Sequence, residues 1–150
     1  MSTSTPSLWS THTFRQLKLV IPGVLATYYL GTLHHFWVVY QGHQGSWPQL
    51  SALILLANGC ITIGLFIYVM LVPLIKGVEP DYRSWRQSGV LSRVIPVLTT
   101  SIVSGWLLLV FTLGQWTRLG FGRGLLGACG VYATMFGLLG LLPAPKLRRV

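Results

Sequence analysis

Four long apolar runs, separated by short polar segments, constrain this chain more than any other feature. They extend over about 17–40, 48–75, 94–116 and 119–142. A transmembrane helix needs about 20 consecutive apolar residues, and every run reaches that length. Only 9% of the 150 residues are charged, whereas soluble domains carry about 25%. The sequence therefore predicts an all-α fold, a bundle of four transmembrane helices over 17–143.

The segments outside this membrane domain are short. Residues 1–16 form a polar N-terminal tail rich in Ser and Thr, and residues 144–150 form a basic C-terminal tail. Neither is long enough to bury a core of its own. We expect one multi-pass integral membrane domain and no separate soluble domain.

The basic residues are distributed unequally along the predicted topology. Of the 11 Lys and Arg residues, Arg118 lies between the third and fourth runs and Arg123 near the start of the fourth, and the other nine lie in the tails, at the start of the first run or in the middle loop. Basic residues favour the cytoplasmic side of a membrane. Both termini are therefore predicted to be cytoplasmic. The formal net charge of +9 is explained by lipid headgroups and topology, and we expect no nucleic-acid partner.

Two pairs of segments suggest a duplicated hairpin. "VIPGVLATYYLG" at Val20 resembles "VIPVLTTSIVSG" at Val94, and "GSWPQL" at Gly45 resembles "GQWTRL" at Gly114. Paired helical hairpins are a known way to build membrane bundles, although apolar segments also resemble one another by chance. The duplication is a hypothesis for the structure to test.

Small residues recur at helical spacing on the first and last runs. They are Gly23, Thr27 and Gly31 on the first, and Gly120, Gly124, Gly127, Gly130, Thr134 and Gly137 on the last. Helices in lipid associate by close backbone approach at such residues. Both stripes should face other helices, and continuing the first stripe by four residues predicts that His35 points into the bundle.

Few residues are suited to chemistry. The only acids, Glu79 and Asp81, lie in the middle loop, so an intramembrane proton pathway is disfavoured. Cys60 and Cys129 have no partners at metal-ligand spacing, and we interpret them as packed core residues. No metal site is predicted. A haem held by two histidines would need a histidine on a second run, which leaves only a single-histidine site or a dimer.

Aromatic and cationic residues gather on the predicted non-cytoplasmic side. Trp and Tyr commonly form a belt at the headgroup level, and this interpretation is strongest for the tryptophans and Arg118. Alternatively, these aromatic and cationic residues form a ligand-binding site. The full set comprises His34, His35, Tyr40, Gln41, His43 and Trp47 from the first half, with Trp116, Arg118 and Arg123 from the second.

Three segments resemble the small four-helix membrane proteins that include the fungal anthrone oxygenases. "HFWVVYQGHQGSWPQLSALILL" resembles their W-x-x-Y-x-x-G-type segment, "WRQSGVLSRVIPVLTT" their third span, and "WTRLGFGRGLLGACG" their W-x-x-L-N-x-x-R motif. Together the segments cover roughly residues 20–135. Gly120 stands where the family has asparagine, which removes one polar contact to the ligand, and the glycine after Tyr40 comes at Gly42.

The resemblance implies oxidation of an anthrone to an anthraquinone by dioxygen, without a cofactor, in aromatic polyketide biosynthesis at an endomembrane. His35 or His34 would act as the base, and Arg123 would stabilise the anion. The hydrophobic aromatic substrate would lie against the substrate-binding residues Trp37, Tyr40, His43, Trp47, Trp116 and Arg118. Protein partners under this hypothesis are a second copy of the chain or other polyketide-pathway enzymes.

The alternative function is a noncatalytic membrane subunit or assembly factor whose small-residue stripes bind partner helices. Pocket geometry separates the two. The oxygenase needs a cavity of about 300 Å³ or more reached by both His35 and Arg123, whereas a filled bundle with outward histidines favours the subunit.

Overall fold

The computed structural model describes residues 8–77, 82–84, 86–87 and 89–142. These residues form α-helices and one 3-10 helix, Tyr82–Ser84, without any strand, and the predicted all-α fold is confirmed. The α-helices are α1 (Leu8–Tyr29), α2 (Thr32–Tyr40), α3 (Ser46–Lys76), α4 (Leu91–Trp116) and α5 (Gly120–Leu141). The two acids and the C-terminal tail predicted above lie outside the described residues.

Three of the described helices are long and apolar enough to cross a membrane. They cover Ser46–Pro73 of α3, Leu91–Trp116 of α4 and Gly120–Leu141 of α5. These segments coincide closely with the second, third and fourth predicted runs. The agreement rests on length and composition alone.

The first predicted run, 17–40, is two helices rather than one. α1 ends at Tyr29 and α2 begins at Thr32, because Gly31 adopts a left-handed conformation with φ of 59°. The N–H groups of Leu30 and Gly31 donate to the carbonyls of Ala26 and Tyr28 and close the end of α1. α1 also begins at Leu8, so part of the segment predicted to be a polar tail is helical.

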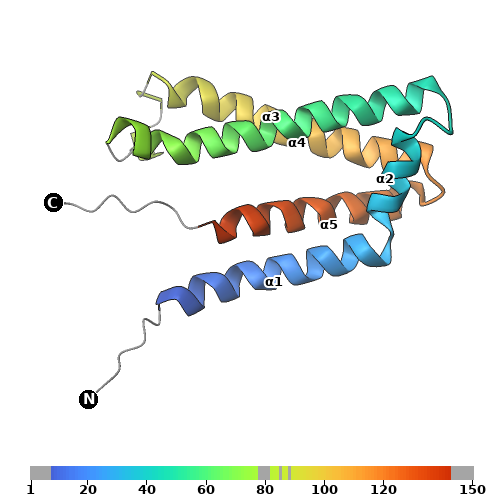
Figure 1. Ribbon diagram of the computed structural model, residues 1–150, viewed down its shortest axis with the longest axis horizontal. Coiled ribbons are helices and arrows are strands. Elements are labelled where there is room, and N and C mark those ends of the chain that lie inside the picture. Colours follow the sequence, from blue (N-terminus) through green and yellow to red (C-terminus); the bar gives the residue numbers. More distant parts are fainter. Residues whose placement is uncertain (1–7, 78–81, 85, 88, 143–150) are drawn as a thin grey trace, which may run out of the picture.

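The helices form an open row in which each long helix packs on the next (Figure 1). α1 packs on α5, α5 on α4, and α4 on α3, while α2 crosses one end of the row and contacts all four. The start of α1 and the end of α5 lie at the same end as the connection from α3 to α4. α2 and the turn from α4 to α5 lie at the other end.

Glycines let α1 and α5 approach closely. A Cβ added at Gly23 of α1 would lie 2.8 Å from the backbone nitrogen of Thr134, and one at Gly130 of α5 would lie 3.2 Å from the carbonyl oxygen of Gly23. A Cβ at Gly137 would overlap the side chain of Val20. The α5 stripe therefore faces α1 at Gly130 and Gly137. Gly124 faces α4 at Gly114 instead, and Gly127 faces Thr32 of α2. Gly120 faces no helix, because it has φ of 75° and open space around it.

A polar network joins α3 to α4 inside the apolar row. The Asn58 side-chain amide donates to the carbonyl of Ser101 at 2.8 Å, and the Ser101 hydroxyl donates to Asn58 Oδ1 at 3.0 Å. The Thr62 hydroxyl lies 2.7 Å from that of Ser101. In hydrocarbon such groups must be satisfied by one another, so the network fixes the register of the two helices.

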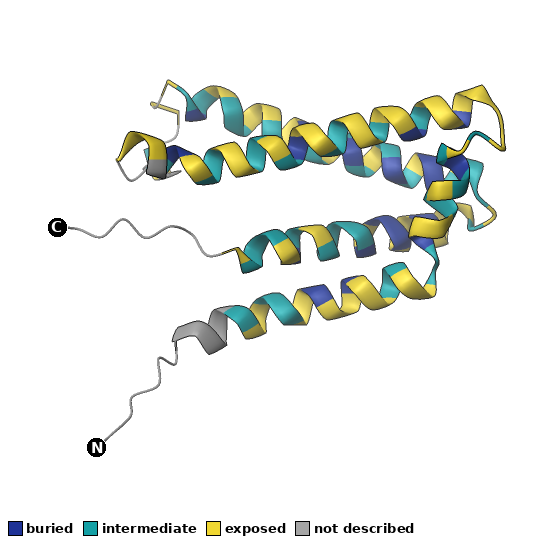
Figure 2. Ribbon diagram, in the orientation of Figure 1, coloured by how far each residue is buried: buried dark blue, intermediate teal, exposed yellow. Residues whose placement is uncertain are grey.

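Buried residues lie mainly where the helices meet (Figure 2). Many large apolar side chains are exposed on the outside. Leu109, Leu113 and Ala128 form the core between α4 and α5. Cys60 and Cys129 are exposed, so their interpretation as packed core residues is wrong. An exposed cysteine on an apolar helix is compatible with lipid contact, because a free thiol behaves as a small hydrophobic group.

The segments that suggested a duplicated hairpin differ in conformation at their corresponding glycines. Gly31 ends a helix at φ of 59°, whereas its counterpart Gly105 is buried inside the unbroken helix α4. Gly45 has φ of 115° before α3, and its counterpart Gly114 lies within α4. The sequence similarity therefore does not extend to equivalent backbone structure at these positions.

Candidate functional site

A partly enclosed cavity of about 200 Å³ lies among α2, α3, α4 and α5. α3 and α5 both pack on α4, and the described residues bring α3 and α5 into no close backbone contact with each other. Side chains line the space that remains between them, and α2 borders it. The lining residues are Thr32, Leu33, Phe36, Leu55, Gly59, Thr62, Ile63, Leu109, Val131, Tyr132, Met135, Phe136 and Leu139.

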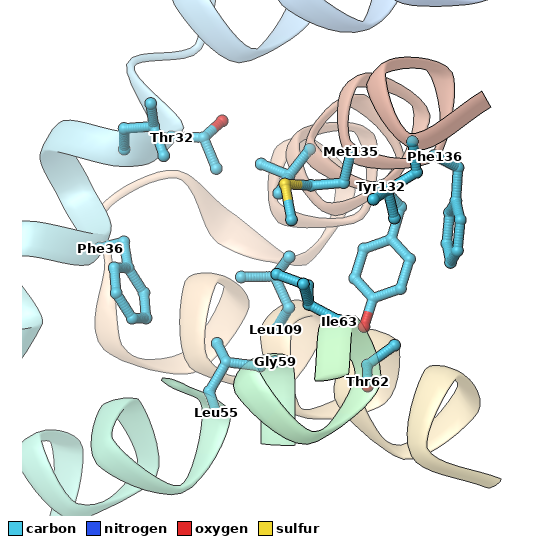
Figure 3. A pocket seen from close by; sticks show the side chains of 13 residues that line it. Thr32, Phe36, Leu55, Gly59, Thr62, Ile63, Leu109, Tyr132, Met135 and Phe136 are labelled. Carbon is cyan, nitrogen blue, oxygen red and sulfur yellow. The ribbon is translucent and has the colours of Figure 1, made fainter. Parts of the chain in front are cut away.

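The walls of the cavity are almost wholly apolar. Phe36 of α2 and Met135 of α5 border it, and Tyr132 extends its ring toward α3 (Figure 3). The rings of Tyr132 and Phe136 lie 5.7 Å apart between centroids, tilted by 51°. Aromatic faces and a flexible methionine suit a flat hydrophobic ligand.

Gly59 keeps one wall of the cavity open. It lies in the middle of α3, and a Cβ added there would meet nothing within 4 Å. Gly64 on the same helix also has open space around it, but it does not line the cavity. A larger side chain at Gly59 would therefore project into free space beside the ligand site, whereas one at Gly64 would not enter it.

Two polar side chains on the cavity wall already have partners. Thr62 donates to the carbonyl of Asn58 at 2.9 Å. Tyr132 donates to the carbonyl of Ile102 at 3.3 Å, which is long for an O–H donor. Gly105 makes room for this arrangement, because a Cβ there would lie 2.5 Å from both the Tyr132 hydroxyl and the Asn58 amide nitrogen.

Thr32 differs from these two residues. It begins α2 and is only 1% exposed, and its hydroxyl is buried without a hydrogen-bond partner among the described residues. That oxygen faces α5, 2.9 Å from the position of a Cβ at Gly127. The close approach of α2 to α5 at this glycine thus encloses the hydroxyl.

The structure does not bring the predicted catalytic residues to the cavity. His34 and Arg123 are exposed and His35 is half-buried, and none of the three lines the cavity. The rings of His34 and His35 lie 6.0 Å apart. The cavity is also smaller than the 300 Å³ expected, so the predicted pocket shared by His35 and Arg123 is not observed among the described residues.

The break at Gly31 explains the position of His35. The stripe of Gly23, Thr27 and Gly31 follows one helix, but α2 starts in a new direction after Gly31. On α2 the buried residues are Thr32 and Val39, with the cavity-lining Phe36 between them at helical spacing. His35 lies next to this face rather than at its centre.

The predicted substrate-binding residues also lie outside the cavity lining. Trp37, His43, Trp47 and Arg118 are exposed, and Tyr40 and Trp116 are half-buried. Trp37 and Tyr40 contact each other, with ring centroids 5.6 Å apart. The Trp116 indole nitrogen is buried without a partner among the described residues. These residues lie on α2, at the start of α3, at the end of α4 and in the connecting turns, all at one end of the row. Their position agrees with an interfacial belt.

The cavity residues of α3 and α5 were not predicted from the sequence. Two signals point to them in retrospect. Asn58 and Thr62 interrupt the most apolar run of the chain, and Tyr132 places a phenol in the middle of the last run. Polar groups at the centre of an apolar helix commonly face a partner or a cavity.

The residues that the structure describes contain no group of three or more His, Cys, Asp and Glu side chains able to hold a metal ion.

Gly120 occupies the position where the resemblance expects asparagine. Its φ of 75° is one that glycine adopts readily and that asparagine tolerates best among the other residues.

A comparison of the chain with protein-family models, curated proteins and solved structures gives no match.

Proposed function

We propose that this chain is a four-pass membrane protein. α3, α4 and α5 each make one pass, and α1 makes the first, with α2 lying across one end of the row. The start of α1 and the end of α5 lie at the same end of the row, which supports placing both termini on one side. The excess of basic residues near these ends and in the middle loop makes this side cytoplasmic.

The function is to bind a small, flat, hydrophobic molecule between α2, α3, α4 and α5. The observation that carries this proposal is the apolar cavity of about 200 Å³ with Phe36, Tyr132 and Phe136 on its walls. Pockets for drug-sized ligands measure about 300–1,000 Å³. The site therefore suits a compound of a few fused rings, part of which extends out of the cavity into the surrounding lipid.

The reaction proposed for this ligand is the oxidation of an anthrone, on the basis of the three similar segments. The methylene group loses a proton, and the resulting carbanion transfers electrons to dioxygen. One oxygen atom becomes the new quinone carbonyl, and the other leaves as water with the two methylene hydrogens. Substrate and dioxygen supply all the electrons, and the protein contributes a dry aromatic site.

Quinone formation in membranes tests this reaction. Membranes that contain the wild-type chain, the variant Gly59→Leu or the variant Gly64→Leu are incubated with an anthrone under air, and quinone absorbance is followed. We expect the wild type and Gly64→Leu to exceed empty membranes. Gly59→Leu should lose at least about four fifths of that excess, because its side chain fills the cavity.

Equal rates in all three preparations and in empty membranes would reject the oxygenase. Equal excess rates in Gly59→Leu and Gly64→Leu would reject the cavity as the place of reaction. The two variants add the same side chain to the same helix, so a difference between them does not arise from hydrophobicity or helix propensity.

The noncatalytic subunit is the second candidate, and the exposed outer face of α1 favours it. Tyr28 and Tyr29 are 87% and 91% exposed, at the edge of the row. Among the described helices, α1 has only α5 and α2 as neighbours there. Such a face could pack against a helix of a partner protein. A chain with this function would form no quinone above empty membranes and would tolerate Gly59→Leu.

A further inference from the structure

Three polar side chains line the cavity, and two of them are not available to a ligand. The Thr62 hydroxyl lies between the Asn58 carbonyl and the Ser101 hydroxyl, at 2.9 and 2.7 Å. The Thr32 hydroxyl is buried against Gly127 and has no measurable surface. The third polar side chain is Tyr132, which is half-buried.

The hydroxyl of Tyr132 has hydrogen-bonding capacity to spare. A phenol can donate one hydrogen bond and accept others. Its donated bond, to the Ile102 carbonyl at 3.3 Å, is long. Ile102 lies inside α4, where the helix itself supplies a donor to that carbonyl. The Tyr132 proton can therefore turn to a ligand without leaving a backbone oxygen unsatisfied.

The position of this hydroxyl depends on Gly105. A side chain at Gly105 would collide with the Tyr132 hydroxyl and with the Asn58 amide, which converge on the same point from α5 and α3. The backbone space at Gly105 thus accommodates the hydroxyl of Tyr132. The Tyr132 side chain itself lies at the edge of an otherwise apolar cavity (Figure 3).

We infer that Tyr132 determines ligand specificity by hydrogen bonding to a single hydroxyl or keto oxygen on an otherwise apolar ring compound. The inference rests on the proposed ligand-binding function and adds the chemical class of the ligand. The apolar body packs against Phe36, Met135 and Phe136. A hydroxyl group would donate to Tyr132, and a keto group would accept from it.

Two ligands of similar shape test this inference. 1-Naphthol and 1-methylnaphthalene differ mainly in whether a hydroxyl or a methyl group is attached to the ring. Their binding to the purified full-length chain in detergent micelles is measured by equilibrium dialysis. The Gly59→Leu protein serves as the blank for partition into the micelle. Wild type should bind the naphthol about fivefold more tightly, the effect of one net hydrogen bond.

The variant Tyr132→Phe should bind both compounds with equal affinity, close to that of wild type for 1-methylnaphthalene. The variant Phe136→Leu is the matched control on the same wall, and it should weaken both compounds alike and keep the fivefold preference. If the Tyr132 hydroxyl had only a structural role, Tyr132→Phe would behave like Phe136→Leu. It would weaken the binding of both compounds equally and keep the preference for 1-naphthol.

The outcomes separate the two proposals. If wild type binds neither compound above the blank, the ligand-binding function and the role of Tyr132 both fail. If wild type binds both compounds equally, or Tyr132→Phe retains the preference, the cavity remains a binding site and the role of Tyr132 is rejected. If Tyr132→Phe does not fold, the affinities of the wild-type protein for 1-naphthol and 1-methylnaphthalene still decide whether the role of Tyr132 is rejected.

Discussion

Individual residues determine whether the cavity exists and what it recognises. Gly59 leaves its wall open, Gly105 makes room for the Tyr132 hydroxyl, and Gly127 allows Thr32 to approach α5. The sequence showed these glycines but not their different roles, because a missing side chain gives no sign of what fills the space. The polar residues Asn58 and Thr62 were a clearer signal, since hydrocarbon requires partners for them.

The histidines provide a prediction at this scale. The double variant His34→Gln, His35→Gln should bind 1-naphthol with an affinity within twofold of wild type, because neither side chain lines the cavity. The measurement is the equilibrium dialysis described above. Loss of binding would place the ligand at the α2 surface instead. Retained binding with loss of quinone formation would assign the base to this histidine pair.

Helix packing was the part of the fold that the sequence predicted best. Apolar length located α3, α4 and α5 to within a few residues, and small-residue spacing identified the facing sides of α1 and α5. The break between α1 and α2 was missed. Gly31 fits the spacing of the helix stripe equally well, and only its left-handed backbone shows that the helix ends there.

The α1–α5 interface gives a prediction at the scale of elements. Gly130→Leu should destabilise the chain by about 2 kcal/mol or more, because backbone and side-chain atoms of α1 lie 3.0–3.2 Å from the added Cβ position. Gly122→Leu, on the same helix with open space around it, should be neutral or slightly stabilising. Unfolding in mixed micelles of increasing denaturing-detergent content measures both.

The reverse order of stability would show that α1 does not pack on α5 through this stripe. Equal stability of the two variants would mean that the interface accommodates a leucine, and that the close approach is not needed for folding.

The arrangement of the whole molecule follows from charge and hydropathy. The predicted topology places the turn between α2 and α3 on the non-cytoplasmic side, and the connection between α3 and α4 on the cytoplasmic side. Gln44 and Gln87 are exposed residues in these two connections. Single cysteines at these positions, in a chain with Cys60→Ala and Cys129→Ala, report which side each connection faces.

In sealed vesicles with the cytoplasmic face outward, a membrane-impermeant maleimide should label Gln87→Cys. Gln44→Cys should react only after detergent is added. Labelling in the opposite pattern would reverse the topology, and equal labelling of both positions would contradict a single orientation. The basic residues favour the predicted orientation because they remain on the cytoplasmic side during insertion.

The central claim, that the cavity holds a small hydrophobic molecule, is tested most directly by competition in photolabelling. A lipophilic aryl diazirine is activated with the protein in lipid vesicles, with and without excess 1-naphthol, and labelled residues are identified by mass spectrometry. We predict that 1-naphthol suppresses labelling of Ile63 and Met135, which line the cavity, and leaves labelling of the exposed Leu126 unchanged. Equal labelling of all three residues with and without 1-naphthol would contradict the claim.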